Sequence, residues 1–239
     1  MKNFITKILK REKKSPEQTY GDTPAIGQIN FGDLRRLKPI SNDFGFRRGG
    51  PVDRYYIERF LKENAADIKG HALEVKDDHY LKMFGGSKVT KADILDIDPN
   101  NPAVTVIADL AAADHIPSNT YDCIVLTQVL QLIFDLRSAI KHLHRILKPG
   151  GVLIITVPGI SHFVYKCYAN YWCWCFTENS ARKLLQEVFS ESKVKTAIHG
   201  NVLVATSFLQ GIGAGELTEK EFNYSDPDYQ VIITAKAVK

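Results

Sequence analysis

The stretch Leu147-Lys148-Pro149-Gly150-Gly151-Val152-Leu153-Ile154-Ile155 joins the clearest helix of the chain to its most apolar strand. Apolar residues recur at helical spacing over residues 136–147, and basic residues gather near the end of that run. Pro149 and the two glycines after it stop the helix sharply. Residues 152–157 are almost wholly apolar, which is typical of a central strand in a sheet that helices cover on both faces.

Seven short runs of β-branched and apolar residues, separated by turn or helix signals, predict the strands of one sheet. They lie at residues 72–75, 88–92, 103–108, 122–126, 152–157, 193–197 and 230–238. The last two fit an antiparallel pair at the sheet edge. The chain is therefore expected to have an α/β fold, with a Rossmann-like, seven-stranded, mostly parallel sheet and helices on both faces.

Three further segments predict helices beside that sheet. They lie at residues 51–70, 178–189 and 201–225. Asp53 can cap the start of the first helix, Gly70 can end it, and Thr177 can cap the second. The third segment is expected to be a helical insertion that partly caps the domain.

The composition is that of an ordinary globular protein. Of the 239 residues, 44% are hydrophobic and 24% are charged, and the formal net charge is +4. Residues 1–14 hold six basic residues against one acidic residue, a net +5, so the remainder carries a net −1. The body of the chain therefore shows no electrostatic footprint for a nucleic acid.

The N-terminal segment has two interpretations. Phe4, Ile5, Ile8 and Leu9 share one helical face, so residues 1–14 fit an amphipathic helix that contacts an anionic membrane surface or a partner, or else a solvated basic tail. The apolar run is too short for a signal peptide, and no stretch approaches the roughly 20 apolar residues of a spanning helix. A cytoplasmic protein is therefore expected.

The four cysteines do not have the spacing of a zinc site. Cys123 lies in an apolar run and fits a small core residue. Cys167, Cys173 and Cys175 form no Cys-x2-Cys pair, and the tryptophans that alternate with them suit a packed strand or a lid. No metal is expected.

Acidic residues close the expected strands, with Glu74 in the first, Asp93 after the second and Asp109 after the third. This order, followed by a strand containing Asp122-Cys123-Ile124-Val125 and by the Leu-Lys-Pro-Gly-Gly motif, resembles the class I S-adenosylmethionine-dependent methyltransferases over residues 50–238. The lead-in FGFRRGGPVDRYYIE, residues 44–58, is similar to that of small bacterial methyltransferase-domain (type 11-like) proteins found beside glycosyltransferases.

The resemblance implies S-adenosylmethionine as the cofactor, a tail and lead-in over residues 1–50, and a methyltransferase-like domain over residues 51–239. It implies that Glu74 orients the methionine end of the cofactor and that Asp93, or Asp96 if the strand ends later, bonds the ribose hydroxyls. The further cofactor-binding candidates are Arg54, Tyr55, Val75, Asp77, Asp109, Leu110 and Gln128. Among these, Asp109 and Leu110 match the adenine position, and Arg54 and Tyr55 are expected near the methionine carboxylate.

Candidates for the chemistry follow from their places in this pattern. His162 comes after the fifth strand and is the expected general base, with His79 and Lys76 as rivals. The residues expected to line the acceptor are Trp172, Trp174 and Tyr80. Each of these residues also fits a packing or surface role.

Two positions depart from the family pattern. Lys76 stands where the turn after the first strand carries glycine, so a positive φ there would strain the lysine. Its ammonium would face the cofactor sulfonium, or it would point outward and pair with Asp77 or Asp78. Cys175 stands where the family suggests an arginine, so the substrate here is expected to differ.

The leading functional hypothesis is methyl transfer to an oxygen or nitrogen of a small metabolite or of a sugar or glycan precursor. The alternatives are a methyltransferase fold repurposed for a non-methylating reaction and a non-catalytic partner subunit. A nucleic acid is not an expected partner. The acceptor and the oligomeric state stay open.

Overall fold

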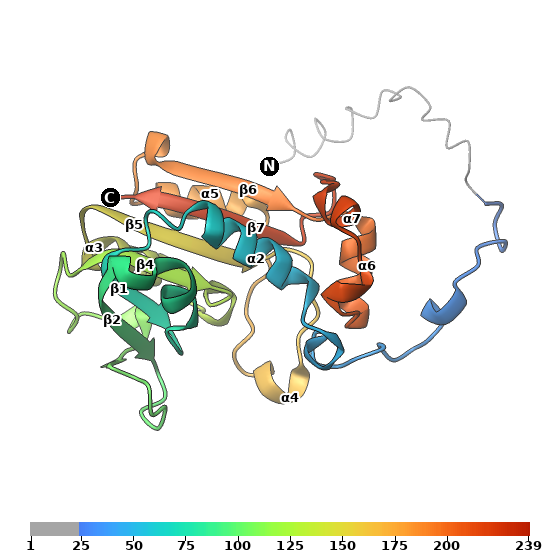
Figure 1. Ribbon diagram of the computed structural model, residues 1–239, viewed down its shortest axis with the longest axis horizontal. Coiled ribbons are helices and arrows are strands. Elements are labelled where there is room, and N and C mark those ends of the chain that lie inside the picture. Colours follow the sequence, from blue (N-terminus) through green and yellow to red (C-terminus); the bar gives the residue numbers. More distant parts are fainter. Residues whose placement is uncertain (1–23) are drawn as a thin grey trace, which may run out of the picture. The chain divides into compact units, whose positions relative to one another are not determined.

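Seven strands form one sheet in the computed structural model, which describes residues 24–239. The strands are β1 (Gly70–Val75), β2 (Val89–Asp96), β3 (Val106–Ile107), β4 (Tyr121–Thr127), β5 (Leu147–Pro158), β6 (Val194–His199) and β7 (Ile232–Val238). Their order is β3-β2-β1-β4-β5-β7-β6, and only the β5–β7 and β7–β6 pairings among them are antiparallel (Figure 1). The predicted mostly parallel sheet with an antiparallel edge pair is confirmed.

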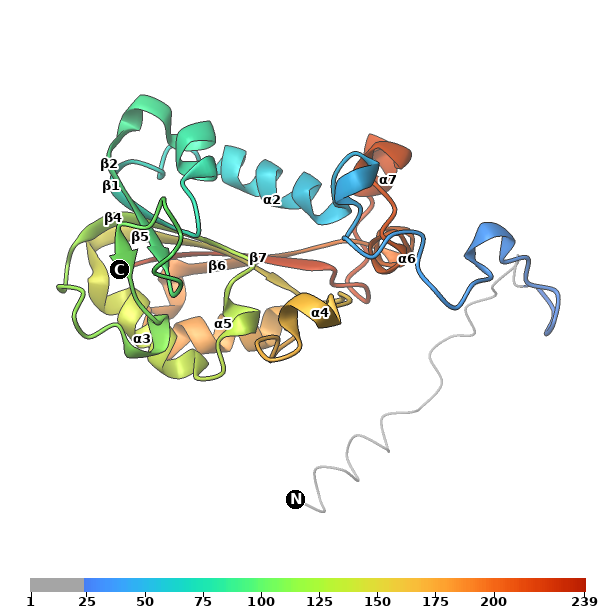
Figure 2. The ribbon, with the colours of Figure 1, turned by 90° about the horizontal axis from the view of Figure 1, so that it is seen from below.

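Helices cover both faces of this sheet. The α-helices of the described residues are α2 (Val52–Glu63), α3 (Leu136–Ile146), α4 (Tyr165–Tyr168), α5 (Glu178–Gln186), α6 (Val202–Gln210) and α7 (Glu219–Asn223). Figure 2 shows α2 on one face and α3 and α5 on the other, while α6 and α7 stand where β6 ends and β7 begins. A cluster with Ile140, Leu143 and Leu153 fills the α3 side, and one with Ile57, Leu61 and Cys123 fills the α2 side. Cys123 is thus a core residue, as predicted.

The connection between α3 and β5 is shorter than the sequence predicts. The helix ends at Ile146 and the strand begins at once with Leu147, five residues before its predicted start. Gly150 has a φ of +79°, in the left-handed region, and a Cβ on Gly151 would meet the backbone oxygen of Tyr121 on β4 at 3.0 Å. β5 pairs with β4 at Leu147 and again from Val152, so the glycines accommodate the register shift between these two positions.

Several predicted boundaries are wrong because tertiary contacts decide them. The first helix ends at Glu63, and Gly70 instead opens β1. Asp53 does not cap that helix: Pro51 occupies the cap position, and the Asp53 side chain is buried. The helix α5 ends at Gln186, three residues early.

The second and third strands also differ from the prediction. β2 continues to Asp96 because the carboxylate of Asp93 finds polar partners inside the fold, so an acidic residue does not end the strand. β3 has only two residues, Val106 and Ile107, because the preceding segment forms a hydrogen-bonded loop.

The chain divides into two units, residues 1–37 and residues 38–239. Within the first unit the described part contains a short 3-10 turn at Gly32–Leu34. The expectations for residues 1–14 lie outside the described residues. Over the part that is described, no helix has the length and hydropathy needed to cross a membrane.

The lead-in over residues 38–50 packs within the second unit. Ser41 N donates to Gln210 O at 3.0 Å, and Ala214 N donates to Gly50 O at 2.8 Å. Pro51 forms an isolated antiparallel bridge with Gly213. The lead-in is therefore held against the insertion between β6 and β7.

Candidate functional site

The carboxyl ends of the parallel strands meet at one edge of the sheet, which is where open α/β sheets bind ligands. β1 pairs in parallel with β2 and β4, β2 with β3, and β4 with β5. The candidates at or just after these ends are Lys76, Asp96, Asp109, Gln128 and His162. The start of α2 reaches the same edge, because α2 runs back along the sheet before β1 begins.

Strained backbone gathers at this edge. Among residues 24–239, four non-glycine residues have a positive φ, and three of them, Phe44 (+60°), Lys76 (+78°) and Gln128 (+55°), belong to the candidate site. Each such residue costs about 1–3 kcal/mol, and they cluster at functional sites in proteins generally. Gln128 is held by a bond from its backbone nitrogen to Thr156 O at 2.9 Å. The fourth residue is Asn119.

Lys76 adopts the backbone conformation that glycine would supply. Its nitrogen donates to Leu95 O at 2.8 Å, and its side chain is exposed. The predicted pairing with Asp77 or Asp78 is wrong: Asp78 pairs with Lys82 at 2.8 Å, and Asp77 accepts a bond from His79 N. An exposed ammonium has no burial to favour its uncharged form, so its surroundings do not support the prediction of Lys76 as a rival general base.

Glu74 is buried, with 4% of its surface exposed, and both of its carboxylate oxygens are occupied. They accept from Tyr80 N at 3.2 Å and from Leu81 N at 2.9 Å, at the start of the π-helical turn Leu81–Gly85. Burial raises the pKa of Glu74 to about 7. The structure thus makes Glu74 the anchor of the loop that follows β1.

This burial predicts a pH-dependent stability. Because the folded pKa of about 7 lies above the ordinary 4.5, the stabilising contribution is present at low pH and is lost as pH rises through 7. Urea denaturation between about pH 5 and about pH 8 should show a loss on the order of 2 kcal/mol that is absent in Glu74→Gln. An equal pH dependence in the variant would contradict the assignment to Glu74.

Asp93 was predicted to follow the end of the second strand, but it lies within β2. The residue is 8% exposed, and its carboxylate is hydrogen-bonded inside the fold. Its oxygens contact His71 Nε2 at 2.7 Å, Thr105 Oγ1 at 3.1 Å and Tyr121 Oη at 3.3 Å. Burial acts to raise the pKa of Asp93, but the bonds from His71 and Thr105 outweigh it and the pKa is lowered. The prediction of Asp93 as the ribose-binding acid is therefore corrected.

Asp96, the fallback candidate, is the residue that ends β2. It is half-buried, and its carboxylate accepts from Asp98 N at 3.1 Å and from Asn101 Nδ2 at 2.7 Å. After β3, Asp109 is exposed and accepts from Ala111 N at 2.8 Å, while Leu110 is buried. These two acids follow adjacent strands, as a pair that holds the ribose and the base would.

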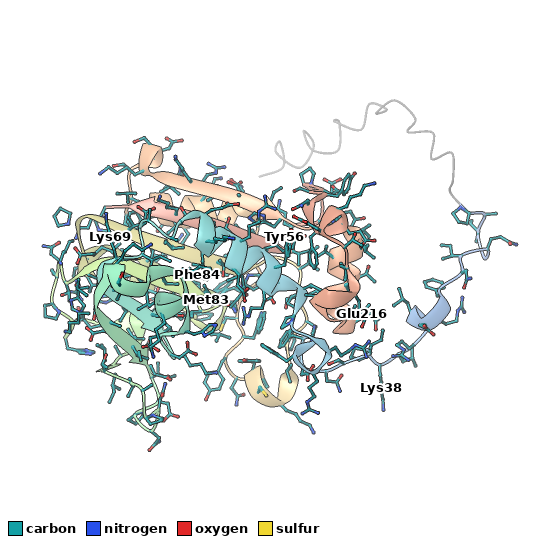
Figure 3. All side chains as sticks on the ribbon, in the orientation of Figure 1. Lys38, Tyr56, Lys69, Met83, Phe84 and Glu216 are labelled. Atoms are coloured by element: carbon teal, nitrogen blue, oxygen red, sulfur yellow. The ribbon has the colours of Figure 1, made fainter. Side chains whose placement is uncertain are left out.

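At the start of α2, Arg54 and Tyr55 have different surroundings. Arg54 Nη1 is shielded from solvent without a hydrogen-bond partner among the described residues, and Asp53 Oδ2 lies 3.6 Å away. Tyr55 instead stacks on Phe222 of α7 at 4.1 Å and donates to Asn223 Oδ1. Next to it, Tyr56, labelled on α2 in Figure 3, donates to Phe222 O. Tyr55 is therefore a packing residue, which corrects its expected cofactor contact.

His162 lies in the connection between β5 and α4 and stacks on Phe44 at 4.3 Å between ring centroids. Both ring nitrogens are shielded from solvent, and neither has a hydrogen-bond partner in the described part of the chain. Burial lowers the pKa of His162 below its usual value. Burial thus favours the uncharged form of the imidazole.

The three residues expected to line the acceptor have different surroundings in the structure. Trp172 lies 6.1 Å from Phe163 between ring centroids, and its Nε1 is buried without a partner among residues 24–239. Trp174 donates from Nε1 to Ile133 O and is 37% exposed. Tyr80 is buried in the core beneath α2, where it stacks on Phe84 (labelled in Figure 3), so its predicted role as an acceptor wall is wrong. His79 is exposed beside it.

Two further residues lie at this edge, and neither is among the site residues predicted from the sequence. Gln131 is 2% exposed, its backbone oxygen accepts from Cys173 N and Trp174 N, and its Oε1 has no partner in the described residues. Phe44 appears in the sequence as part of a lead-in motif, and only the fold brings its ring onto His162. Gln131 comes three positions after the predicted Gln128 in the sequence, and this short spacing is the one sequence signal that points to it.

Unpaired buried polar atoms gather at the start of α2 and in the segments that follow β4 and β5. The described part of the chain has eight such side-chain atoms, and six belong to Asp53, Arg54, Gln131, His162 and Trp172. Leaving a buried polar group unpaired costs about 1–3 kcal/mol, so native proteins concentrate such groups where a ligand or water completes them. In the same described part, no group of three or more His, Cys, Asp or Glu side chains is arranged to hold a metal ion.

The sheet order, the acids that end adjacent strands and the helical insertion before the last strand define the class I methyltransferase fold, whose cofactor is S-adenosylmethionine. The chain belongs to the methyltransferase-domain family, whose sequence profile matches residues 63–207. The predicted class is confirmed.

Individual relatives agree on the fold. A S-adenosylmethionine-dependent methyltransferase from Archaeoglobus fulgidus superposes with a TM-score of 0.54 at 11% identity, covering 82% of this chain and 97% of its own. The N-methyltransferase NodS from Bradyrhizobium japonicum, in complex with S-adenosyl-L-homocysteine, gives 0.52 at 13% identity, covering 84% and 94%. At these identities the likeness concerns the fold.

Curated relatives match shorter segments. The ubiquinone/menaquinone biosynthesis C-methyltransferase UbiE from Haemophilus ducreyi is 43% identical over 47 residues, which is 19% of this chain and 18% of its own length. The mitochondrial arginine-hydroxylase NDUFAF5 from Rattus norvegicus is 28% identical over 122 residues, or 51% of this chain and 29% of its own. The matches thus span less than a third of either relative.

Proposed function

We propose that this protein transfers a methyl group from S-adenosylmethionine to an oxygen or nitrogen atom of a small metabolite or of a sugar or glycan precursor. The observation that carries the proposal is the set of unpaired buried polar atoms at the carboxyl edge of the sheet, where open α/β folds bind ligands. The cofactor supplies a methyl group made electrophilic by its sulfonium. The protein therefore needs mainly to bind and align the two reactants.

The residues at this edge suit the cofactor. Asp96 ends β2, and its carboxylate would accept bonds from the ribose hydroxyls. Asp109, which follows β3, would accept from the adenine amine. Arg54 Nη1, buried without a hydrogen-bond partner in the described chain, would donate to the methionine carboxylate. Lys76 keeps the backbone of a glycine turn and leaves its ammonium exposed, which reduces repulsion of the sulfonium.

His162 is suited to serve the acceptor. Burial favours the uncharged form of its imidazole, and an unpaired ring nitrogen of that form could take the proton of an acceptor hydroxyl or amine. The ring of Phe44 stacks on His162, and the ring of Trp172 lies near Phe163, the next residue. Both rings would offer apolar contact to an acceptor. Cys175, where the family suggests arginine, is exposed and uncharged in its thiol form, which favours an acceptor without a phosphate or carboxylate at that position.

A second candidate is a non-methylating reaction on the same fold. The observation that favours it is the match to a relative whose name is that of an arginine hydroxylase. Fold similarity does not decide chemistry. Cofactor affinity and methyl transfer separate the two candidates.

Calorimetric titration of the protein with S-adenosylhomocysteine tests the leading candidate. We expect binding with a Kd on the order of micromolar. Because Lys76 is exposed, Lys76→Gly is expected to change this affinity by less than about threefold while raising the free energy of unfolding by about 1 kcal/mol. If the natural protein does not bind S-adenosylhomocysteine and Lys76→Gly does, this result would contradict methyl transfer by the natural protein and favour the second candidate.

A further inference from the structure

We propose that Asn101 is a positioning residue of the cofactor site, which aims the Asp96 carboxylate and holds the turn at Lys76. The inference rests on the proposed function and deepens it. It explains how a chain that lacks the glycine of the first turn keeps that turn beside the ribose-binding acid. Asn101 lies in the loop between β2 and β3, which contains none of the residues predicted to bind the cofactor.

A single amide nitrogen joins the two parts of the site. Asn101 Nδ2 donates to Asp96 Oδ2 at 2.7 Å and to Lys76 O at 2.8 Å. The amide group has two N–H donors, so both are used. Its Oδ1 accepts from Ala103 N at 3.0 Å, and its backbone nitrogen donates to Asp98 O. The side chain is thus held at both ends.

The turn at Lys76 needs this support because its backbone is unfavourable for lysine. A φ of +78° places Lys76 in the left-handed region, which only glycine adopts without steric strain. Leu95 O on β2 accepts from the nitrogen of Lys76, and Asn101 donates to its carbonyl oxygen. Bonds on both sides of the residue therefore hold a conformation that the side chain disfavours.

The Asp96 carboxylate gains a defined orientation from the same contact. Asp98 N donates to Oδ1 and Asn101 Nδ2 donates to Oδ2, so both oxygens are fixed. Each carboxylate oxygen can accept a second bond, which leaves capacity for two ribose hydroxyls. A carboxylate held in place before the ligand arrives loses less conformational freedom on binding.

Two substitutions separate this role from general loop stability. Asn101→Ala removes the amide, and Asn101→Asp keeps an oxygen for Ala103 N but replaces the donor by a carboxylate beside Asp96. We expect S-adenosylhomocysteine affinity to fall about 10-fold in the first and about 30-fold in the second. The matched control is Asn100→Asp, which adds the same charge in the same loop, where the amide bonds only Asp98. It should change affinity by less than about twofold.

A ligand that lacks a ribose hydroxyl gives the decisive readout. The affinities of the natural protein and of Asn101→Ala are measured for S-adenosylhomocysteine and for its 2′-deoxy analogue. If Asn101 acts by aiming Asp96 at the ribose, the loss in Asn101→Ala should shrink to about two- to threefold for the analogue. An equal loss with both ligands would show a merely structural role and overturn the proposal.

The outcomes also distinguish this inference from the proposed function. Failure of the natural protein to bind S-adenosylhomocysteine would overturn both. Normal binding by the natural protein together with unchanged affinity in Asn101→Ala and Asn101→Asp would overturn the role of Asn101 alone.

Discussion

Replacing Asp93 by alanine is expected to lower the free energy of unfolding by about 3 kcal/mol and to leave cofactor binding nearly unchanged. The carboxylate of Asp93 is buried and bonded to His71, Thr105 and Tyr121. Its removal leaves a histidine nitrogen and a tyrosine hydroxyl (Tyr121 is 1% exposed) without their acceptor. Breaking one side of a buried polar pair costs more than the pair contributes, because the remaining group stays desolvated.

Urea denaturation of the natural protein and of Asp93→Ala measures this effect. Lys91→Ala is the control, because Lys91 also approaches Asp93, at 3.5 Å, but has a side chain that is 63% exposed. It should change stability by less than about 1 kcal/mol. A stable Asp93→Ala protein that no longer binds S-adenosylhomocysteine would restore Asp93 as the ribose-binding acid.

The opposite result is expected at Asp96. Asp96→Ala should weaken S-adenosylhomocysteine binding about 100-fold, because the two charge-assisted hydrogen bonds that we propose between Asp96 and the ribose would be lost. Stability should fall by less than about 1 kcal/mol, since the carboxylate is only half-buried and its present donors lie in a surface loop.

Titration calorimetry and urea denaturation of the same samples check both parts of this prediction. Asp98→Ala removes a neighbouring exposed carboxylate and serves as the control for charge. Equal losses of affinity in Asp96→Ala and Asp98→Ala would show that the local negative charge, and not the placed carboxylate, attracts the ligand.

Local sequence patterns were enough to predict the order of the seven strands and of the helices other than α4 in the described part of the chain. The apolar run after Pro149-Gly150-Gly151 is one example, because a buried central strand needs apolar side chains on both faces. Thr177 is another: its side chain caps α5 through Ser180 N as expected. Signals of this kind depend on neighbours in the chain, so no tertiary contact is needed to read them.

The site could be predicted only in part. Acids at strand ends are visible in sequence, but the choice between Asp93 and Asp96 depends on which one finds partners on other strands. His71 and Tyr121, which bind Asp93, lie 22 and 28 residues away. Periodicity along the chain carries no information about such contacts.

The sequence by itself determined the fold class, the acidic residues expected at one edge of the sheet, and the unusual lysine after the first strand, because spacing and residue type specify these locally. Only the tertiary structure decided that Lys76 keeps the backbone of a glycine and that Asn101 joins it to Asp96. It alone also decided that His162 meets Phe44 with both nitrogens unpaired. Burial and hydrogen bonding between distant segments set these features, and both arise only when the chain is folded.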